Sequence, residues 1–505
     1  MKSGTRAVAL ASGVAVLVLA AASFFFVTVF INDDYLFLTF ARLVRNPLVA
    51  FVSDQHGGEF YRPIPMTLWW LLTHAGGGAP WPFMLATAAL HTLVAAEIAL
   101  LVRLVGEEKI VAVTAGIFFF LAPQTLDAAY WFSASTDLLA TAVALGSLIV
   151  LRRARRRASL IGLSALLAAV AYLCKESALI LPLLAWLVMR GAKGEATSGK
   201  FVVPHALLAA GYVVVRWFIL RGWGGSGDAR ASLSGKALQL LSGLVHIATG
   251  QAALPEPLAW GLGAVVLLVL LRHAFVAHRR REPKPAVTLA LALVGIALLP
   301  LVGADWAVGS RYFYFPTVGV AWLMARQLVA TPVVGRALIF GLLIFCDFRQ
   351  ARQRHVEIGA FTERLAACRR AVIAGLDRGH TVFQIGSGIK DLDLALKADP
   401  VLANDPRAAS LLVLTDVPAS FVLRPPALAA PAAFMVASPP LPPSGAYRFG
   451  AGRVVGLARR GDDPLLSQVV DHFPDTQFIT LRLSGAGKVI TRNITQEITG
   501  NVNLR

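Results

Sequence analysis

The sequence predicts a polytopic α-helical membrane protein with about eleven transmembrane helices, followed by a small C-terminal α/β domain outside the membrane. Of the 505 residues, 56% are hydrophobic and only 15% are charged, whereas a soluble globular protein carries about 25% charged residues. The apolar residues come in long runs, and the loops between these runs alternate between basic and less basic. This composition excludes a soluble enzyme, a disordered protein and a collagen-like fibre.

The first apolar run follows Lys2 and Arg6 and continues to Ile31. Its basic start resembles a signal peptide, but the run extends well past the small residues at 21–23, so we expect an uncleaved anchor. A spanning helix needs about 20 mostly apolar residues. Further spans are expected near residues 82–102, 110–126, 136–151, 159–174, 177–189, 201–220, 255–271, 286–302, 314–332 and 336–346.

The Lys and Arg residues of the connecting loops predict the orientation of the chain. With a cytoplasmic N-terminus, every strongly basic loop falls on the inner side, at 103–109, 152–157, 190–200, 272–284 and 326–336. The basic residues behind the net charge of +18 therefore orient the chain, and we expect their side chains to contact membrane lipids. Because these loops are short, we expect no nucleic acid as a partner. Residues 1–346 form the predicted transmembrane domain, and residues 347–505 lie outside the membrane.

The tail from 347 to 505 has a different composition, in which a helix-like stretch at 351–376 is followed by short β-like runs. These runs lie at 381–385, 411–414, 434–437 and 477–483. The alternation favours a small α/β domain. The glycine motifs of the tail match neither a dinucleotide fingerprint nor a phosphate loop, so we expect ordinary turns there. Three cysteines without a CxxC pattern support neither a disulfide framework nor a structural zinc site.

Ionisable residues at the ends of apolar spans are the informative ones in a membrane protein. Asp33 and Asp34 directly follow the first span and begin the outer segment 32–80. Adjacent carboxylates repel each other, and an ionised one at the membrane boundary can accept a proton from an acceptor hydroxyl. The alternative is a solvated helix cap, since Asp and Asn often begin or end helices.

Two further outer positions carry cations. Arg62 follows Tyr61 in the outer segment, and its planar guanidinium suits phosphate oxygens or anchors the chain among lipid headgroups. Lys175 lies beside Glu176 at the outer tip of a predicted helical hairpin. These two residues either neutralise each other, or Lys175 contacts a phosphate while Glu176 orients it.

A third cation, Arg311, enters a later span from the outside together with Tyr312 and Tyr314. A single arginine at this position can also snorkel to the membrane surface. Asp137 belongs to a weaker polar group around another outer turn. The lone His91 has no metal-ligand spacing, so we expect it to pack or to form hydrogen bonds.

The order of these motifs along residues 20–320 resembles that of the GT-C glycosyltransferases, in particular the protein O-mannosyltransferase-like branch that uses polyprenyl-phosphate sugars. Eukaryotic members of this branch carry a tetratricopeptide tail, which this chain does not share, and Asp127 stands where relatives often have Glu. The resemblance rests on Asp33-Asp34, Tyr61-Arg62-Pro63, His91, Pro123, Asp127, Trp131, Asp137, Lys175-Glu176 and Arg311-Tyr312-Phe313-Tyr314-Phe315-Pro316.

This resemblance implies an enzyme that transfers a sugar from a polyprenyl-phosphate-linked donor to a protein, lipid or glycan acceptor, with inversion of the anomeric carbon. Asp33 or Asp34 would be the general base of the reaction. The residues that would hold the leaving phosphate are Arg62, Lys175 and Arg311. Those that would position these cations or the sugar are Tyr61, Asp137, Glu176, Tyr312 and Tyr314.

No residue spacing indicates a metal site, but Asp33-Asp34 can serve either as a base or as metal ligands, so a divalent metal stays open as a cofactor. The alternative function is a transporter or flippase of lipid-linked sugars. The one-sided polar clusters and the lack of internal symmetry favour the enzyme. A non-catalytic assembly or receptor protein would leave these clusters without a role. Abundant Ala, Arg and Gly favour a bacterial inner membrane.

Overall fold

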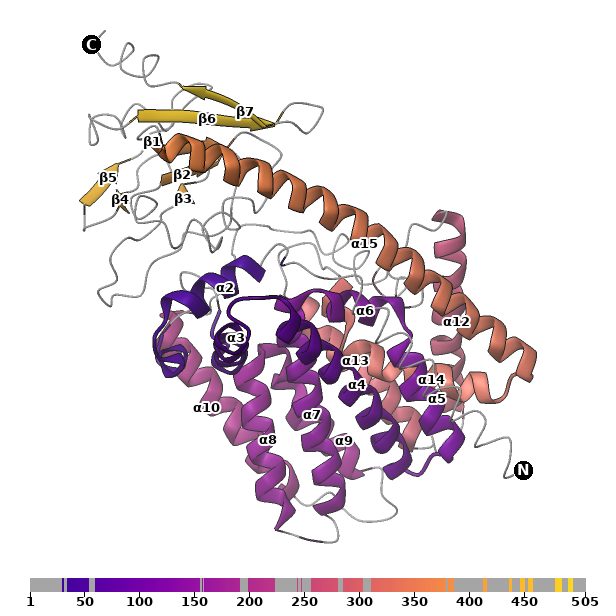
Figure 1. The fold of residues 1–505 in the computed structure, drawn as a ribbon. Helices are drawn as coiled ribbons and strands as arrows, with labels where there is room; N and C mark the ends of the chain where they lie inside the picture. Colours follow the sequence, from indigo (N-terminus) through magenta and orange to yellow (C-terminus); the bar gives the residue numbers. More distant parts are fainter. Residues whose placement is uncertain are drawn as a thin grey trace. The chain divides into compact units, whose positions relative to one another are not determined.

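In the computed structural model, whose elements Figure 1 shows, the described residues fall into two units. Described residues of unit 1 lie within Tyr61–Leu68 and Ala79–Val356, and those of unit 2 within Val29–Phe60, Trp69–Gly78 and Glu357–Arg505. The described residues are 30, 34–53, 60–154, 157, 159–190, 199–222, 243, 247, 256–279, 285–302, 310–377, 380–385, 412–415, 436–437, 446–449, 453–456, 477–483 and 489–493.

Unit 1 is a bundle of helices. Its α-helices are α4 (Trp81–Leu104), α5 (Lys109–Phe120), α6 (Pro123–Tyr130), α7 (Ser135–Ala154), α8 (Leu160–Cys174), α9 (Leu181–Arg190), α10 (Val203–Leu220), α12 (Glu256–Arg279), α13 (Pro285–Val302) and α14 (Pro316–Val329). Short 3₁₀ helices connect some of them: η3 (Phe132–Ala134), η4 (Glu176–Ile180), η5 (Gly199–Phe201) and η6 (Ser310–Phe313). Helix α4 packs against α5 and α7, α7 packs against α8, and α5 and α13 both pack against α14 (Figure 1).

Proline sets the start of several helices of unit 1. It occupies the first or second position of α4, α6, α10 and α14. Its fixed φ suits the helix there, and its lack of an N–H loses no hydrogen bond, because the first N–H groups of a helix have no partner within the helix. The span predicted at 110–126 is not one straight helix. Pro123 holds Ala122 in an extended conformation (φ −75°, ψ 119°), which divides the run into α5 and α6 with a bend of 54°.

The other predicted spans that fall on described residues coincide with helices. The spans near 82–102, 136–151, 159–174 and 201–220 correspond to α4, α7, α8 and α10. The span near 177–189 overlaps η4 and α9, and those near 255–271, 286–302 and 314–332 overlap α12, α13 and α14. The last predicted span, near 336–346, lies within the helix that follows α14. Among the described residues, three helices are long and apolar enough to cross a membrane, or four if α5 and α6 form one bent span. The first predicted span lies outside the described residues, so the number eleven stays a prediction.

Helix α15 (Val333–Leu376) is continuous over 44 residues. The sequence predicts a span that ends at 346 and a separate helix at 351–376, and this division is wrong. No proline or glycine occurs between 342 and 358, so nothing in the backbone interrupts the helix there. The helix contributes residues to both units.

The N-terminal part of unit 2 contains α2 (Asp34–Leu43) and η1 (Pro47–Phe51). Asn46 caps η1, because its side-chain oxygen accepts a hydrogen bond from the backbone N–H of Leu48 at 3.0 Å. The last residues of α3 (Pro63–Ala75) also belong to this unit, and there Trp70 Nε1 donates to the carbonyl of Val44 at 2.8 Å. Most of the predicted outer segment 32–80 is therefore structured.

The tail of unit 2 contains a five-stranded sheet with the strand order β3-β2-β1-β6-β7. Its strands are β1 (His380–Ile385), β2 (Leu412–Thr415), β3 (Val436–Ala437), β6 (Gln477–Leu483) and β7 (Val489–Asn493). Neighbours pair in parallel except β6 and β7, and the strands β4 (Ala446–Phe449) and β5 (Arg453–Gly456) form a separate antiparallel pair. Four of these strands, β1, β2, β3 and β6, lie on the predicted β-like runs. The connections between the parallel strands lie outside the described residues, so the α/β domain stays a prediction.

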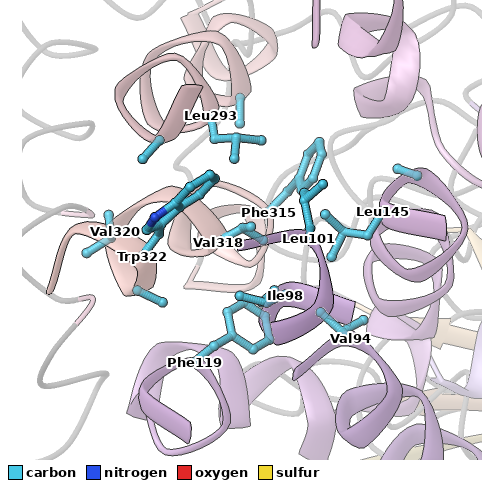
Figure 2. Packing of buried hydrophobic residues seen from close by; sticks show 14 of the residues in the cluster. Val94, Ile98, Leu101, Phe119, Leu145, Leu293, Phe315, Val318, Val320 and Trp322 are labelled. Carbon is cyan, nitrogen blue, oxygen red and sulfur yellow. The ribbon is translucent and has the colours of Figure 1, made fainter. Parts of the chain in front are cut away.

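The hydrophobic core of unit 1 lies where α4, α5, α7, α13 and α14 meet (Figure 2). Phe119 and Trp322 are completely buried in it. The helices approach closely at two glycines: a Cβ atom on Gly116 would lie 2.6 Å from the carbonyl oxygen of Ala95, and one on Gly319 would overlap the carbonyl oxygen of Ala290. Small residues of this kind allow helices to pack closely in membranes.

Substitution of Gly319 by alanine is expected to lower the free energy of unfolding by about 1–3 kcal/mol, because the added methyl group forces α13 and α14 apart. Thermal unfolding of the detergent-solubilised protein measures this effect. The matched control is Gly295→Ala on α13, where a Cβ meets no atom within 4 Å. This control should unfold at the same or a higher temperature, because alanine favours the helix. Equal behaviour of the two variants would contradict the packing argument.

Candidate functional site

Arg62 and Glu176 form a two-point ion pair in unit 1. The Nε atom of Arg62 donates to Oε2 of Glu176 at 3.1 Å, and its Nη2 donates to Oε1 at 2.5 Å. Arg62 directly precedes Pro63, the first residue of α3, and a residue before proline is disfavoured in the helical conformation. The planar guanidinium matches the carboxylate, so the pair fixes the orientation of both side chains.

Lys175 and Asp137 form a second ion pair, with 2.5 Å between Nζ and Oδ1. The extended backbone of Lys175 (φ −163°, ψ 141°) ends α8 at Cys174. Asp137 lies in the first turn of α7, where the helix dipole favours a negative charge. The two side chains are only 5% and 9% exposed. Each buried charge depends on the other, because removal of one partner of such a pair costs about 3–5 kcal/mol.

Arg311 and Tyr312 of η6 contact the same region through aromatic rings. The guanidinium carbon of Arg311 lies 4.1 Å from the centre of the Trp131 ring, and the Nζ atom of Lys175 lies 4.7 Å from the centre of the Tyr312 ring. Trp131 follows the last residue of α6, and its buried Nε1 has no hydrogen-bond partner among the described residues. Arg311 also lies 5.2 Å from the Tyr312 ring, so this tyrosine connects the two cations.

These contacts bring together six of the residues that the sequence selects, from four separate parts of the chain. We call them the polar cluster: Arg62, Asp137, Lys175, Glu176, Arg311 and Tyr312. The neighbours Lys175 and Glu176 do not neutralise each other. Each pairs instead with a distant residue, so that each carboxylate of the cluster holds one cation in place.

The ion pair between Arg62 and Glu176 keeps both of its members charged. Burial alone would raise the pKa of Glu176, but nearby cations outweigh burial and lower this pKa to about 2. These cations are, in order of effect, Arg62, Arg216 and Lys175. Burial alone would lower the pKa of Arg62, but the Glu176 carboxylate outweighs it and raises the pKa. Both members of this pair are therefore ionised at neutral pH.

Arg216 is a charged residue near the cluster that the sequence argument does not select. It lies on α10, its charge acts on Glu176, and its side chain forms a hydrogen bond with Tyr212. The sequence nevertheless carries a signal for Arg216, because it is a single arginine within an apolar run. An ionisable residue within a span is costly and marks a functional position.

Tyr61 and Tyr314 lie buried beside the cluster. Tyr61 is 2% exposed, its ring lies 6.0 Å from that of Tyr212, and its carbonyl accepts a hydrogen bond from the Tyr212 hydroxyl at 3.2 Å. Burial raises the pKa of Tyr61. The hydroxyl of Tyr314 lies 2.9 Å from Nδ1 of the buried His91. Packing and hydrogen bonding are the roles that the sequence predicts for this histidine.

The structure does not test the two candidate bases. Asp33 lies outside the described residues. Asp34 is the first residue of α2 in unit 2, and it is completely buried. The assignment of either carboxylate as the base therefore stays a prediction. Within the described part of the chain, no group of three or more His, Cys, Asp or Glu residues could hold a metal ion.

No protein-family model and no curated protein matches this chain. Among solved structures, the chain is similar to ArnT from Cupriavidus metallidurans in the apo state, with a TM-score of 0.51 and 12% identity over 82% of this chain and 86% of that chain. ArnT bound to undecaprenyl phosphate gives a TM-score of 0.48 and 14% identity over 80% of this chain and 85% of that chain.

The archaeal oligosaccharyltransferase AglB from Archaeoglobus fulgidus, in complex with an inhibitory peptide and a dolichol-phosphate, gives a TM-score of 0.44 and 12% identity. That comparison covers 76% of this chain and 63% of AglB, so the chain spans somewhat less than two thirds of the oligosaccharyltransferase. The likeness to apo ArnT shows a shared fold.

Proposed function

We propose that this protein is a membrane glycosyltransferase that moves a sugar from a polyprenyl-phosphate carrier to an extracytoplasmic acceptor, with inversion of the anomeric carbon. The order of its motifs favours the protein O-mannosyltransferase-like branch, with a protein, lipid or glycan as acceptor. The observation that carries the proposal is the polar cluster, in which Arg62, Lys175 and Arg311 come from distant parts of the chain.

The cluster has the chemistry that a leaving lipid phosphate requires. Breaking the bond between the anomeric carbon and the phosphate oxygen leaves negative charge on the phosphate, and cations already in position stabilise this charge. Arg62 and Lys175 are oriented by their carboxylate partners. Arg311 is oriented by stacking on Trp131, which uses the face of the guanidinium, whereas phosphate oxygens bind at its edge. The Nε1 of Trp131, which has no partner in the described part of the chain, is a further donor in this region.

The acceptor side of the reaction requires a base. In the proposed mechanism, Asp33 or Asp34 takes the proton of the acceptor hydroxyl while the oxygen attacks the anomeric carbon. The carbon–oxygen bond to the phosphate breaks, and polyprenyl phosphate leaves with the bonding electrons. Attack opposite the phosphate accounts for the inversion. This mechanism uses residues of the chain alone, and a divalent metal is not part of it.

The comparison with ArnT supports the proposal at the level of the fold, and ArnT has also been solved with undecaprenyl phosphate. We further propose a bacterial inner membrane as the location, with the N-terminus in the cytoplasm and residues 347–505 on the outer side. The basic loops at 103–109 and 272–284 support this orientation, because Lys and Arg are enriched in cytoplasmic loops.

A transfer assay with the full-length chain in lipid nanodiscs tests the proposal. The donor is a polyprenyl-phosphate sugar, and the products measured are free polyprenyl phosphate and glycosylated acceptor. Substitution of Arg311 by Gln is expected to raise the KM for the donor about tenfold to a hundredfold, since a hydrogen bond to a charged group contributes about 1.5–3 kcal/mol.

The matched control is Arg153→Gln, which removes an exposed arginine of α7 and should leave the KM unchanged. Movement of the intact lipid-linked sugar between the two leaflets, without release of polyprenyl phosphate, would instead identify a flippase.

A further inference from the structure

His91 is fully enclosed in unit 1, and its two ring nitrogens face different partners. Its Nε2 atom lies 3.2 Å from the carbonyl oxygen of Phe120, and its Nδ1 atom lies 2.9 Å from the hydroxyl of Tyr314. A carbonyl only accepts, so Nε2 carries the proton and donates to Phe120. The Nδ1 atom of the neutral ring then accepts, and the Tyr314 hydroxyl donates to it.

This arrangement joins three elements. His91 lies in the middle of α4, Phe120 is the last residue of α5, and Tyr314 follows η6 directly. The last carbonyls of a helix have no partner within the helix, and the bond from His91 gives the Phe120 carbonyl such a partner. Ring contacts support the same geometry, with 4.9 Å between the rings of His91 and Phe120 and 5.1 Å between those of Phe119 and Tyr314.

Tyr314 in turn holds η6 in place. Its backbone N–H donates to the carbonyl of Arg311 at 3.1 Å, and the hydroxyl of Thr317 donates to the carbonyl of Phe313 at 2.7 Å. Phe313 and Tyr314 are buried, whereas Arg311 is only partly buried. Phe313 and Tyr314 therefore anchor the turn on its buried side. Arg311 and Tyr312, which belong to the polar cluster, lie in the less buried part of the same turn.

We propose that His91 is a positioning residue that sets the place of Arg311 and Tyr312 through its hydrogen bond to Tyr314. This inference rests on the proposed function, in which Arg311 binds the donor phosphate. Arg311 stacks on Trp131 and Tyr312 lies against Lys175, so a shift of η6 displaces both contacts together. A displacement of about 1 Å at such a site can change a rate about a hundredfold.

The first test measures the accessibility of Arg311 without any enzymatic assay. The full-length chain in nanodiscs is treated with phenylglyoxal, and the modification of Arg311 is followed by mass spectrometry with exposed Arg153 as the internal reference. His91→Leu and Tyr314→Phe should each modify several-fold faster at Arg311 than the wild type. His91→Gln should modify at the wild-type rate, because its amide can both donate to Phe120 and accept from Tyr314.

The second test measures the KM for the donor and kcat with the transfer assay. His91→Leu and Tyr314→Phe should raise the KM about tenfold to a hundredfold, and His91→Gln should restore it. The matched control His74→Leu, at an exposed histidine of α3, should leave both constants unchanged. Tyr314→Phe keeps the ring packing, so it stays informative if His91→Leu does not fold.

The two tests separate the inference from the proposed function. Equal phenylglyoxal rates at Arg311 in the wild type, His91→Leu and Tyr314→Phe would overturn the positioning role. So would a loss of transfer in His91→Gln as large as that in His91→Leu. Absence of transfer by the wild type, together with faster modification of Arg311 in Tyr314→Phe, would overturn the proposed function and leave the role of His91 in placing η6 intact.

Discussion

Substitution of Asp33 or Asp34 by Asn is expected to slow sugar transfer about 100- to 10 000-fold at whichever residue is the base, because an amide cannot take the proton of the acceptor hydroxyl. Asparagine has nearly the shape of aspartate, so the substitution removes the charge with little change in volume. The KM for the donor should change little, because the base acts on the acceptor. The measurement is kcat for transfer from a polyprenyl-phosphate sugar in nanodiscs.

The control for this experiment is Glu363→Gln, which makes the same change from carboxylate to amide at an exposed position of α15. This variant should transfer sugar at the wild-type rate. Membrane insertion of all variants is checked by their recovery in the detergent-soluble fraction. If the Asp33→Asn/Asp34→Asn double variant transferred sugar as fast as the wild type, neither residue would be the base.

Substitution of Lys175 by Met is expected to lower the free energy of unfolding by about 3–5 kcal/mol and to abolish measurable transfer. The loss of stability follows because Asp137, with its side chain 9% exposed, would keep a buried charge without its partner. The loss of transfer follows separately, if Lys175 stabilises the leaving phosphate. Thermal unfolding in detergent and the transfer assay measure the two effects.

The double variant Lys175→Met/Asp137→Leu separates these effects. Replacement of a buried ion pair by apolar residues is often neutral or stabilising, so the unfolding temperature should recover toward the wild-type value. Transfer should not recover, because no cation replaces Lys175. Recovery of both quantities would show that the lysine serves only to neutralise Asp137, and it would remove Lys175 from the phosphate site.

The helical architecture is largely readable from the sequence because it depends on local properties. Long apolar runs predict helices wherever they occur, and the described helices α4, α7, α8 and α10 fall on such runs. The differences between the predicted and the observed helices have local causes as well. Pro123 divides a run that hydropathy reads as one span, and the absence of a breaker after 341 lets α15 continue beyond its predicted end.

The sequence by itself determined which residues to consider for a site, since ionisable side chains within or beside apolar spans are the informative ones in a membrane protein. Only the tertiary structure decided how they pair. Adjacent Lys175 and Glu176 look like one ion pair in the sequence, yet each binds a carboxylate or guanidinium far along the chain. Helix packing sets these partners, and it also brings His91 into contact with Tyr314, which directly follows the turn that carries Arg311. Sequence spacing does not encode such pairings, because they depend on the distances between helices that meet only in the folded bundle.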